Sequence, residues 1–149
     1  MPLLRAAVIW NFVVDTAVCA SLLAQLIKVL LNLFIFHRFI AERMWGAGGM
    51  PSSHSATVCA MVVATGRYCG VSSPIFAIAA VLSIIVMYDA MGVRYETGEQ
   101  AKVLNRMFTE WMDQGFEQFQ LPHGKKLKEM VGHTPIEVLT GAALGIVLG

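Results

Sequence analysis

Charged side chains are scarce in this sequence, which excludes a soluble domain of ordinary composition. Asp, Glu, Lys and Arg make up 14% of the 149 residues, against roughly 25% in an average soluble domain. The formal net charge is +1, so no basic field argues for nucleic acid, and no nucleic-acid partner is expected. Hydrophobic residues reach 56% and the mean hydropathy is +0.63. These values are typical of a small integral membrane protein, and we expect one domain over residues 1–149.

Paired cysteines, leader signals and repeats are also lacking. Cys19, Cys59 and Cys69 are odd in number and lie in apolar stretches, so we interpret them as small buried hydrophobic residues and not as disulfides or metal ligands. The N-terminus has no clear small-x-small cleavage site, so no cleaved signal peptide is expected. No period of roughly 20 to 50 residues is present, which argues against a repeat architecture.

The chain does have long apolar stretches, separated by glycine, proline and polar residues. Because about 20 apolar residues cross a bilayer, residues 6–36 predict either one long tilted helix or two shorter helices. Residues 70–74 predict a tight turn. Together the stretches predict an all-α integral membrane bundle of about four to five transmembrane helices. The further apolar helices are expected at 55–68, 75–91 and 133–149.

The polar region 95–130 contains apolar side chains at every fourth position. This spacing predicts an amphipathic interfacial helix that lies on the membrane surface or against the bundle. The two series are Val103, Met107 and Trp111, and Leu104, Phe108, Met112 and Phe116. In the last apolar stretch, Gly141, Gly145 and Gly149 have the same spacing, and small residues so placed predict close packing against another helix.

The order of the apolar stretches gathers most basic side chains on one side of the membrane. Stretches 55–68 and 75–91 form a hairpin, so residues 37–54 and 92–132 must lie on the same side, whether residues 6–36 cross once or twice. The positive-inside rule predicts that this side is cytoplasmic. Its basic residues are Arg38, Arg43, Arg94, Lys102, Arg106, Lys125, Lys126 and Lys128.

The most distinctive stretch is residues 48–56, Gly-Gly-Met-Pro-Ser-Ser-His-Ser-Ala. Two glycines and a proline predict a turn, after which the serines and the histidine begin a helix. Free N–H groups and a positive dipole end make a helix N-terminus an anion site. In the simpler interpretation, Ser52 or Ser53 only caps the helix. The titratable His54 inside the cap, next to a membrane-like segment, favours the anion site.

A second histidine, His133, lies four residues before Glu137 at the start of the last apolar stretch. Residues at this spacing share a helical face. A carboxylate there can hold an imidazole in the tautomer and orientation that a nucleophile needs. The alternative is an N-cap network in which Glu137 lies near the positive end of the helix dipole.

Arg94 follows the third apolar stretch and carries a planar guanidinium suited to phosphate oxygens. It can instead form an ion pair with Asp89, Glu96 or Glu99, as surface arginines commonly do. A third interpretation is that these three acids hold a divalent ion together with a lipid phosphate. The sequence leaves these alternatives open.

Gln25, Lys28 and Asn32 share one face of the first helix. A lysine inside a membrane is costly and tends to face a polar cavity, so this face is expected to line a site. Alternatively, Lys28 extends to the membrane interface along its apolar stem. His37 and His123 are interpreted as solvated loop residues.

These motifs resemble those of the type 2 phosphatidic acid phosphatase superfamily, which also contains vanadium haloperoxidases. The second family motif is Pro-Ser-Gly-His, and residues 51–54 resemble it with serine for glycine. The third motif ends in His-x-x-x-Asp, which His133 and Glu137 resemble with Glu for Asp. With Asp-Ala-x-Gly-Val-Arg at 89–94, the pattern looks like the divergent bacterial and plant branch, and the likeness covers most of the chain.

The resemblance implies hydrolysis of a phosphomonoester without a metal or another cofactor. His133 would attack phosphorus and form a phosphohistidine, Glu137 would orient His133, and His54 would be the general acid for the leaving group. Lys28 would stand for the lysine of the first motif, and the Leu127 position, between Lys126 and Lys128, replaces the arginine of the third. The substrate oxygens would be bound by Lys28, Arg94, the backbone of Ser52 and Ser53, and Arg38 in place of the first motif's arginine.

The sequence therefore predicts a membrane lipid-phosphate phosphatase with its site at the cytoplasmic interface. Candidate substrates are phosphatidate, phosphatidylglycerophosphate or a polyprenyl phosphate, and an inner-leaflet site favours the first two. Expected partners are the lipid phosphate and membrane lipids, with a homo-oligomer left open. The alternative is a non-catalytic membrane protein that binds or moves phospholipids and retains the anion pocket.

Overall fold

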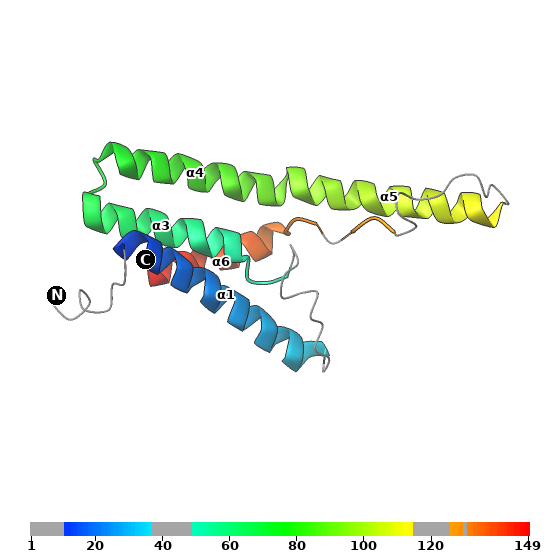
Figure 1. Ribbon diagram of the computed structural model, residues 1–149, viewed down its shortest axis with the longest axis horizontal. Helices are drawn as coiled ribbons and strands as arrows, with labels where there is room; N and C mark the ends of the chain where they lie inside the picture. Colours follow the sequence, from blue (N-terminus) through cyan, green and yellow to red (C-terminus); the bar gives the residue numbers. More distant parts are fainter. Residues whose placement is uncertain (1–10, 37–48, 115–125, 130) are drawn as a thin grey trace.

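The computed structural model describes residues 11–36, 49–114, 126–129 and 131–149 (Figure 1). Over these residues the protein is all-α, as predicted, and contains no strand. The second and third predicted helices begin and end within two residues of their expected bounds. The helices are α1 (Phe12–Phe36), α3 (Ser53–Cys69), α4 (Pro74–Met91), α5 (Val93–Asp113) and α6 (Pro135–Leu148).

Helix α3 is the centre of the bundle, since it contacts α1, α4 and α6. The core between α1 and α3 consists of alanines, namely Ala20 and Ala24 from α1 and Ala56 and Ala60 from α3, all fully buried. Small side chains let two helix backbones approach closely, which is how helices pack where lipid removes the hydrophobic drive between them. The α1–α3 contact therefore depends on close backbone packing and not on large interlocking side chains.

The glycine series of α6 packs against α3 and confirms the close packing predicted from its spacing. A Cβ at Gly141 would lie 2.2 Å from the Ser52 carbonyl oxygen, and one at Gly145 would lie 2.3 Å from that of Ala56. Both contacts are far shorter than any real Cβ makes, so only glycine fits at these positions. Because the contact advances in the same direction on both helices, α3 and α6 are parallel and begin at the same end of the bundle.

Helices α3 and α4 form the predicted antiparallel hairpin (Figure 1). Gly70 ends α3 with a φ of 84°, a conformation that glycine adopts at little cost. The Ser73 side chain then caps α4, which has Pro74 in its first turn. Since the hairpin reverses the chain, the start of α3, the end of α4 and the start of α6 all lie at one end of the bundle.

Helix α5 continues in line with α4 and extends beyond the bundle (Figure 1). The hydrogen-bond ladder runs through the junction, because Gly92 N–H donates to Tyr88 O and Glu96 N–H donates to Gly92 O. Among the described helices, α5 contacts α4 alone. Helix α5 therefore does not lie against the other described helices of the bundle, and the alternative, that it lies on the membrane surface, stays a prediction.

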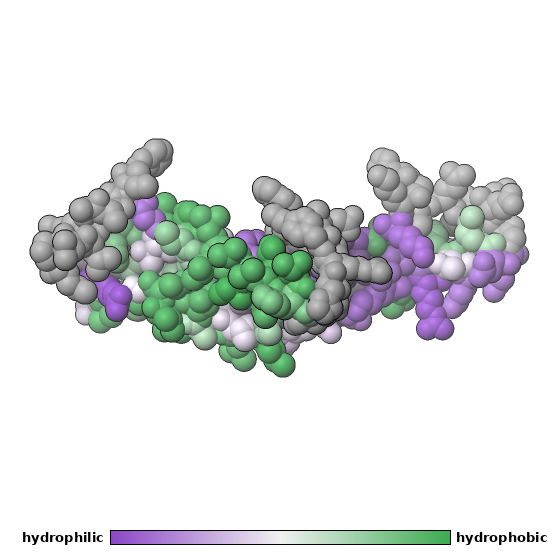
Figure 2. Space-filling model, turned by 90° about the horizontal axis from the view of Figure 1, so that it is seen from below, coloured by the Kyte–Doolittle hydropathy of each residue, from purple (hydrophilic) through white to green (hydrophobic). Residues whose placement is uncertain are grey.

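Two helical stretches are long and apolar enough to cross a membrane, Phe12–Phe34 and the α4 part of Pro74–Asp113. Residues 12–36 form one helix and not two. Helices α3 and α6 are about 26 and 21 Å long at 1.5 Å per residue, shorter than a bilayer core of roughly 30 Å. Figure 2 shows hydrophobic side chains over the bundle and hydrophilic ones over the end formed by α5. The count of four to five transmembrane helices stays a prediction.

Candidate active site

A small cavity of about 20 Å³ lies at the end of the bundle where α3 begins, α4 ends and α5 begins. A volume of this size holds about one water-sized group. Four of its six lining side chains are titratable or charged, although they come from separate parts of the chain. The lining residues are His54, Val86, Asp89, Ala90, Arg94 and His133.

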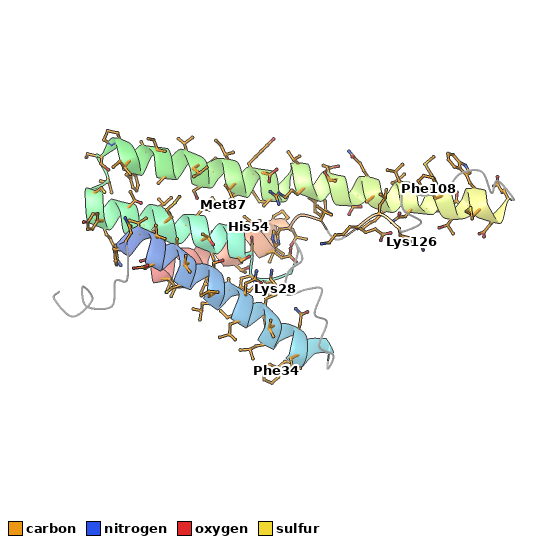
Figure 3. The ribbon with its side chains drawn as sticks, in the orientation of Figure 1. Lys28, Phe34, His54, Met87, Phe108 and Lys126 are labelled. Carbon is orange, nitrogen blue, oxygen red and sulfur yellow. The ribbon has the colours of Figure 1, made fainter. Side chains whose placement is uncertain are left out.

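The two histidines of the predicted motifs meet at this cavity. The ring centroids of His54 and His133 are 6.4 Å apart, with the ring planes at 63°. His54 lies in the first turn of α3 and is exposed, and it is labelled in Figure 3. His133 immediately precedes the cap of α6 and is only 3% exposed. A group bound in the cavity would therefore contact one buried imidazole and one open to solvent.

The backbone around His133 is fixed by the junction of α4 and α5. His133 N–H donates to the carbonyl oxygen of Ala90 at 3.0 Å. Gly132 has a φ of 87°, and a Cβ there would lie 2.4 Å from the Tyr95 nitrogen. Glycine is therefore required both by the backbone conformation and by the close approach to α5. These contacts hold His133 against the end of α4, although it belongs to the segment that leads into α6.

The His133 ring is oriented by Glu137. Nδ1 of His133 lies 3.2 Å from Oε2 of Glu137, and the same oxygen accepts the N–H of Thr134 at 3.0 Å. The Thr134 side chain in turn accepts the N–H of Glu137, which completes a capping box at the start of α6. The contact with Glu137 places the imidazole proton on Nδ1, so the lone pair is on Nε2. The predicted orienting pair and the alternative N-cap network are thus present together.

Burial lowers the pKa of His133 below its ordinary value of about 6.5. The hydrogen bond and the negative charge of Glu137 oppose this shift, while the positive charges of Lys28 and His54 add to it. Because desolvation disfavours the charged form of an imidazole, His133 is neutral at pH 7. A neutral imidazole with a free lone pair is the form that can act as a nucleophile.

Lys28 is almost completely buried at the same end of the bundle, with 2% of its surface exposed. Its stem passes Gly49, where a Cβ would lie 3.5 Å from Lys28 Cδ, and in Figure 3 its side chain lies toward the start of α6. Its charge acts on Glu137, yet within the described ranges no carboxylate lies within ion-pair distance of it. The side chain of Lys28 is therefore enclosed by the protein and does not reach solvent along its stem.

The predicted polar face of α1 does point at this end. Gln25 donates from Nε2 to the Ser53 hydroxyl at 3.3 Å, and its Oε1 is buried with no partner in the described part of the chain. Asn32, one turn beyond Lys28, donates to the Lys28 carbonyl oxygen at 2.9 Å. Gln25 and Lys28 therefore reach the start of α3, whereas this bond of Asn32 is to its own helix.

Ser52 is the N-cap of α3, so the predicted capping role is present, and the anion site at this helix start stays a prediction. The Ser52 hydroxyl accepts the N–H and the hydroxyl of Ser55 at 3.4 and 3.1 Å. The N–H of Ser52 donates to the Glu137 carbonyl oxygen at 2.9 Å and is therefore not available to a ligand. In the first turn of α3, the N–H groups of Ser53 and His54 have no bond within the described residues, so an anion would be bound by these groups.

Arg94 forms an ion pair with Asp89 through its Nε, one of the three alternatives that the sequence left open. Both side chains line the cavity, and the pair leaves the two terminal nitrogens of the guanidinium as further donors. Glu99 pairs with Lys102 on the outside of α5, so the three acids do not converge. No group of three or more metal-ligating side chains is found in the ranges that the structure describes.

The remaining predicted residues do not reach the cavity in the described part of the chain. Arg38, His37 and His123 lie outside the described residues. Lys126 and Lys128 are exposed beside α5. Val86 and Ala90 are cavity residues that the sequence did not indicate, and Asp89 was indicated only as a partner of Arg94 or a ligand of a divalent ion. The signal for Asp89 was its place in the Asp-Ala-Met-Gly-Val-Arg stretch, where the continuous helix through Gly92 brings it to Arg94.

Residues 9–148 match the model of a family described as the divergent PAP2 family. The chain is 38% identical over 144 residues to the uncharacterized membrane protein YuiD of Bacillus subtilis (strain 168). This match covers 93% of the present chain and 91% of that relative. No solved structure matches.

Proposed function

Because the chain belongs to the divergent PAP2 family and is a membrane protein, we propose that it hydrolyses the phosphomonoester of a membrane lipid without a metal. The observation that carries this proposal is the Glu137–His133–His54 arrangement: a buried neutral imidazole, oriented by a carboxylate, faces a second imidazole across a cavity. These are the groups that a two-step phosphoryl transfer through histidine requires.

In the first step, the Nε2 lone pair of His133 forms a bond to phosphorus while the P–O bond to the lipid alcohol breaks. The electron pair of that bond goes to the leaving oxygen, which takes a proton from His54 as general acid. His54 must therefore start in its protonated form, and because burial and the charges of Arg94 and Lys28 lower its pKa, this form is favoured at acid pH. The Nδ1 proton stays on His133, and Glu137 stabilises the positive charge that develops on the ring. The products of this step are a lipid alcohol and a phosphohistidine at position 133.

In the second step, water attacks the phosphohistidine and regenerates the enzyme. His54, now neutral, accepts a proton from the water, the new P–O bond forms, and the N–P bond returns its electron pair to Nε2 of His133. The exposure of His54 supports this assignment, because the group that exchanges protons in both steps must reach solvent. His133 is shielded, which suits a group that must stay unprotonated.

Two cations lie near the position where the phosphoryl oxygens would lie: Arg94 lines the cavity, and the charge of Lys28 acts on both histidines. Lys28 is buried with no carboxylate within ion-pair distance in the described residues, and burying an unpaired charge is unfavourable unless a counter-ion binds. Arg94 adds two free guanidinium nitrogens, and the parallel helices α3 and α6 both direct their positive dipole ends to this region. Since phosphoryl transfer is catalysed mainly by positioning and charge stabilisation, this environment supports the proposal.

The substrate class follows from where the cavity lies. Val86 and Ala90 line it from the membrane-spanning α4, so the phosphate of a lipid could enter with its tails beside that helix. Phosphatidate, phosphatidylglycerophosphate and polyprenyl phosphate are the candidates. The positive-inside rule favours a site at the cytoplasmic face, and a site there would favour the first two.

Phosphate release from a lipid panel tests this function. Protein purified in detergent is incubated with each lipid phosphate in the presence of EDTA, and free phosphate is measured. We expect release by the wild type, none by His133→Ala, and an acid-labile phosphorylated intermediate on rapid quenching. His123→Ala, a matched histidine change, should keep activity. Absence of turnover on every lipid phosphate would refute catalysis.

A second candidate function is phospholipid binding or transport without turnover. The observation that favours it is the Arg94–Asp89 ion pair, which occupies one donor of the cavity, together with the small volume of the cavity. A protein of this kind would bind lipid phosphates with an affinity that depends on Lys28 and would release no phosphate. Lipid binding measured beside phosphate release separates the two functions.

A further inference from the structure

Asn105 is the buried polar side chain of helix α5, with 4% of its surface accessible, on the same helix as the buried small residues Gly98 and Ala101. Its Nδ2 donates to the carbonyl oxygen of Leu127 at 2.9 Å and to Oε1 of Glu129 at 2.8 Å. Its Oδ1 accepts the N–H of Leu127 at 2.8 Å. The amide therefore pairs with both backbone groups of one residue, as a neighbouring strand would, and all its donors and its acceptor oxygen are used.

From Leu127 the chain runs along α5 toward the active site. A Cβ at Gly98 would lie 2.6 Å from the Glu129 carbonyl oxygen and 2.8 Å from that of Val131. Gly132 touches the backbone of Arg94 and Tyr95, and His133 donates to Ala90. Each successive contact lies closer to the N-terminal end of α5, and the last one is on α4. The segment that carries His133 therefore runs antiparallel to the α4–α5 helix, from Asn105 to Ala90.

This segment is held at several points along the α4–α5 helix. Leu127 is fixed by Asn105, the carbonyl oxygens of Glu129 and Val131 lie against Gly98, and His133 is bound to Ala90. A shift of Leu127 would therefore disturb the contacts that lead to His133.

We propose that Asn105 is a positioning residue that sets the register of the His133 segment. This inference rests on the proposed function in one respect, that His133 is the attacking group. By fixing both backbone groups of Leu127, Asn105 fixes where the segment meets Ala90, and hence where the His133 ring lies relative to Glu137 and His54. The part of α5 around Asn105, which lies outside the cavity that Arg94 lines, would thereby contribute to catalysis.

The test compares four single variants and one double variant of the full-length protein. Asn105→Ala removes all three bonds, and Asn105→Asp keeps an acceptor for Leu127 but places a carboxylate beside Glu129. Glu129→Gln keeps an oxygen that can accept from Asn105, and Arg106→Ala is the matched control, since Arg106 is exposed and pairs with Glu110. The double variant Asn105→Asp with Glu129→Gln restores a hydrogen bond between the two side chains.

We expect kcat to fall about 10- to 100-fold in Asn105→Ala and Asn105→Asp, as for a catalytic group displaced by about an ångström. KM should change less than twofold, because Lys28 and Arg94 are not on this segment. Glu129→Gln and Arg106→Ala should match the wild type, and the double variant should recover part of the kcat lost in Asn105→Asp. Equal kcat in all variants would overturn the proposal.

A measurement that needs no turnover separates this inference from the proposed function. In ¹⁵N-histidine NMR spectra, the His133 signal is assigned by its loss in His133→Ala, and we expect the Nδ1–H tautomer in the wild type and a mixture of tautomers in the Asn105 variants. If the wild type has no phosphatase activity, the proposed function fails, and this spectrum alone decides the role of Asn105. An unchanged His133 spectrum in a folded Asn105 variant overturns the positioning role, even if kcat falls. If Asn105→Ala does not fold, Asn105→Asp and its double variant decide.

Discussion

One oxygen of the Glu137 carboxylate contacts two neighbouring residues: Oε2 lies 3.2 Å from Nδ1 of His133 and accepts the N–H of Thr134 at 3.0 Å. The capping box therefore holds the carboxylate still, and the carboxylate holds the imidazole. Helix stability and ring orientation are coupled through this one side chain, but they depend on different properties of it. The cap needs an acceptor oxygen, whereas a developing imidazolium needs a negative charge.

Glu137→Gln separates these two properties. Glutamine also completes a capping box, so we expect the melting temperature to change little. The loss of the negative charge beside His133 should lower kcat by about 100-fold, in the range of a lost electrostatic contact. Thr134→Ala is the converse variant: it removes the cap, costs about 1 kcal/mol of stability, and keeps the His133–Glu137 contact. Phosphate release and thermal unfolding of both variants check this, and a large loss of stability in Glu137→Gln would contradict it.

The pH dependence should report the lowered pKa of His133. Burial is the main cause of the shift, so the neutral form persists below pH 6.5, and kcat/KM should decline on the acid side only as the pH falls through the lowered pKa. Glu137 opposes the shift, so Glu137→Gln should move this acid limb to still lower pH. The measurement is a kcat/KM profile between pH 4 and 9 for both proteins. An acid limb that moves upward in the variant would contradict the assignment.

The same shift has a consequence for stability, with a defined sign. Because the pKa is lower in the folded state than in the unfolded state, the unfolded chain binds more protons in the interval between them. The contribution of neutral His133 is therefore fully present above the unfolded pKa of about 6.5 and is lost as the pH falls toward the folded value. Thermal unfolding of the wild type and of His133→Asn from pH 7.5 to 5 checks this: the difference in melting temperature should shrink as the pH falls.

The sequence was sufficient for elements whose signals are local. The helix from 53 to 69 was predicted within two residues, because glycines and a proline precede it and Gly70 ends it. The α6 glycines were assigned to close packing from their spacing alone. His133 was predicted inside a helix that in fact begins at Pro135. The Thr-Pro-x-Glu pattern at 134–137, a capping box with proline in the first turn, was the local signal that could have corrected this bound.

The sequence was insufficient where the result depends on contacts distant in the chain. Gly92 could equally have turned the chain onto the bundle, and only the hydrogen bonds through it continue α4 into α5. Asp89 lines the cavity together with Arg94 because α4 and α5 are continuous through Gly92. Asn105 looked like any polar residue of an amphipathic helix, since its partners Leu127 and Glu129 lie more than twenty positions away. No periodicity encodes such a contact.

Substitution of Gly145 tests the α3–α6 contact that sets the two helix starts side by side. A Cβ at this position would lie 2.3 Å from the Ala56 carbonyl oxygen, so Gly145→Ala must separate the helices. We expect a loss of about 1 to 3 kcal/mol, as for overpacking of a core, with lower activity because His54 and His133 move apart. Val147→Ala, at an exposed position of the same helix, is the control. Thermal unfolding in detergent measures both, and equal stability of the two variants would refute the contact.

Lys28 gives the sharpest contrast between stability and function. In the unliganded protein its charge is buried with no ion pair among the described residues, and such a charge opposes folding. Lys28→Met has similar length and no charge, so we expect a higher melting temperature than the wild type in the absence of ligand.

The same variant, Lys28→Met, should lose most of its affinity for orthovanadate, a phosphate analogue. Addition of vanadate should therefore raise the melting temperature of the wild type, through preferential binding to the folded state, and leave that of Lys28→Met unchanged. Lys102→Met, which removes an exposed charge on α5, should do neither. If Lys28→Met lowers the melting temperature and still binds vanadate, Lys28 is not the counter-charge of a phosphate group.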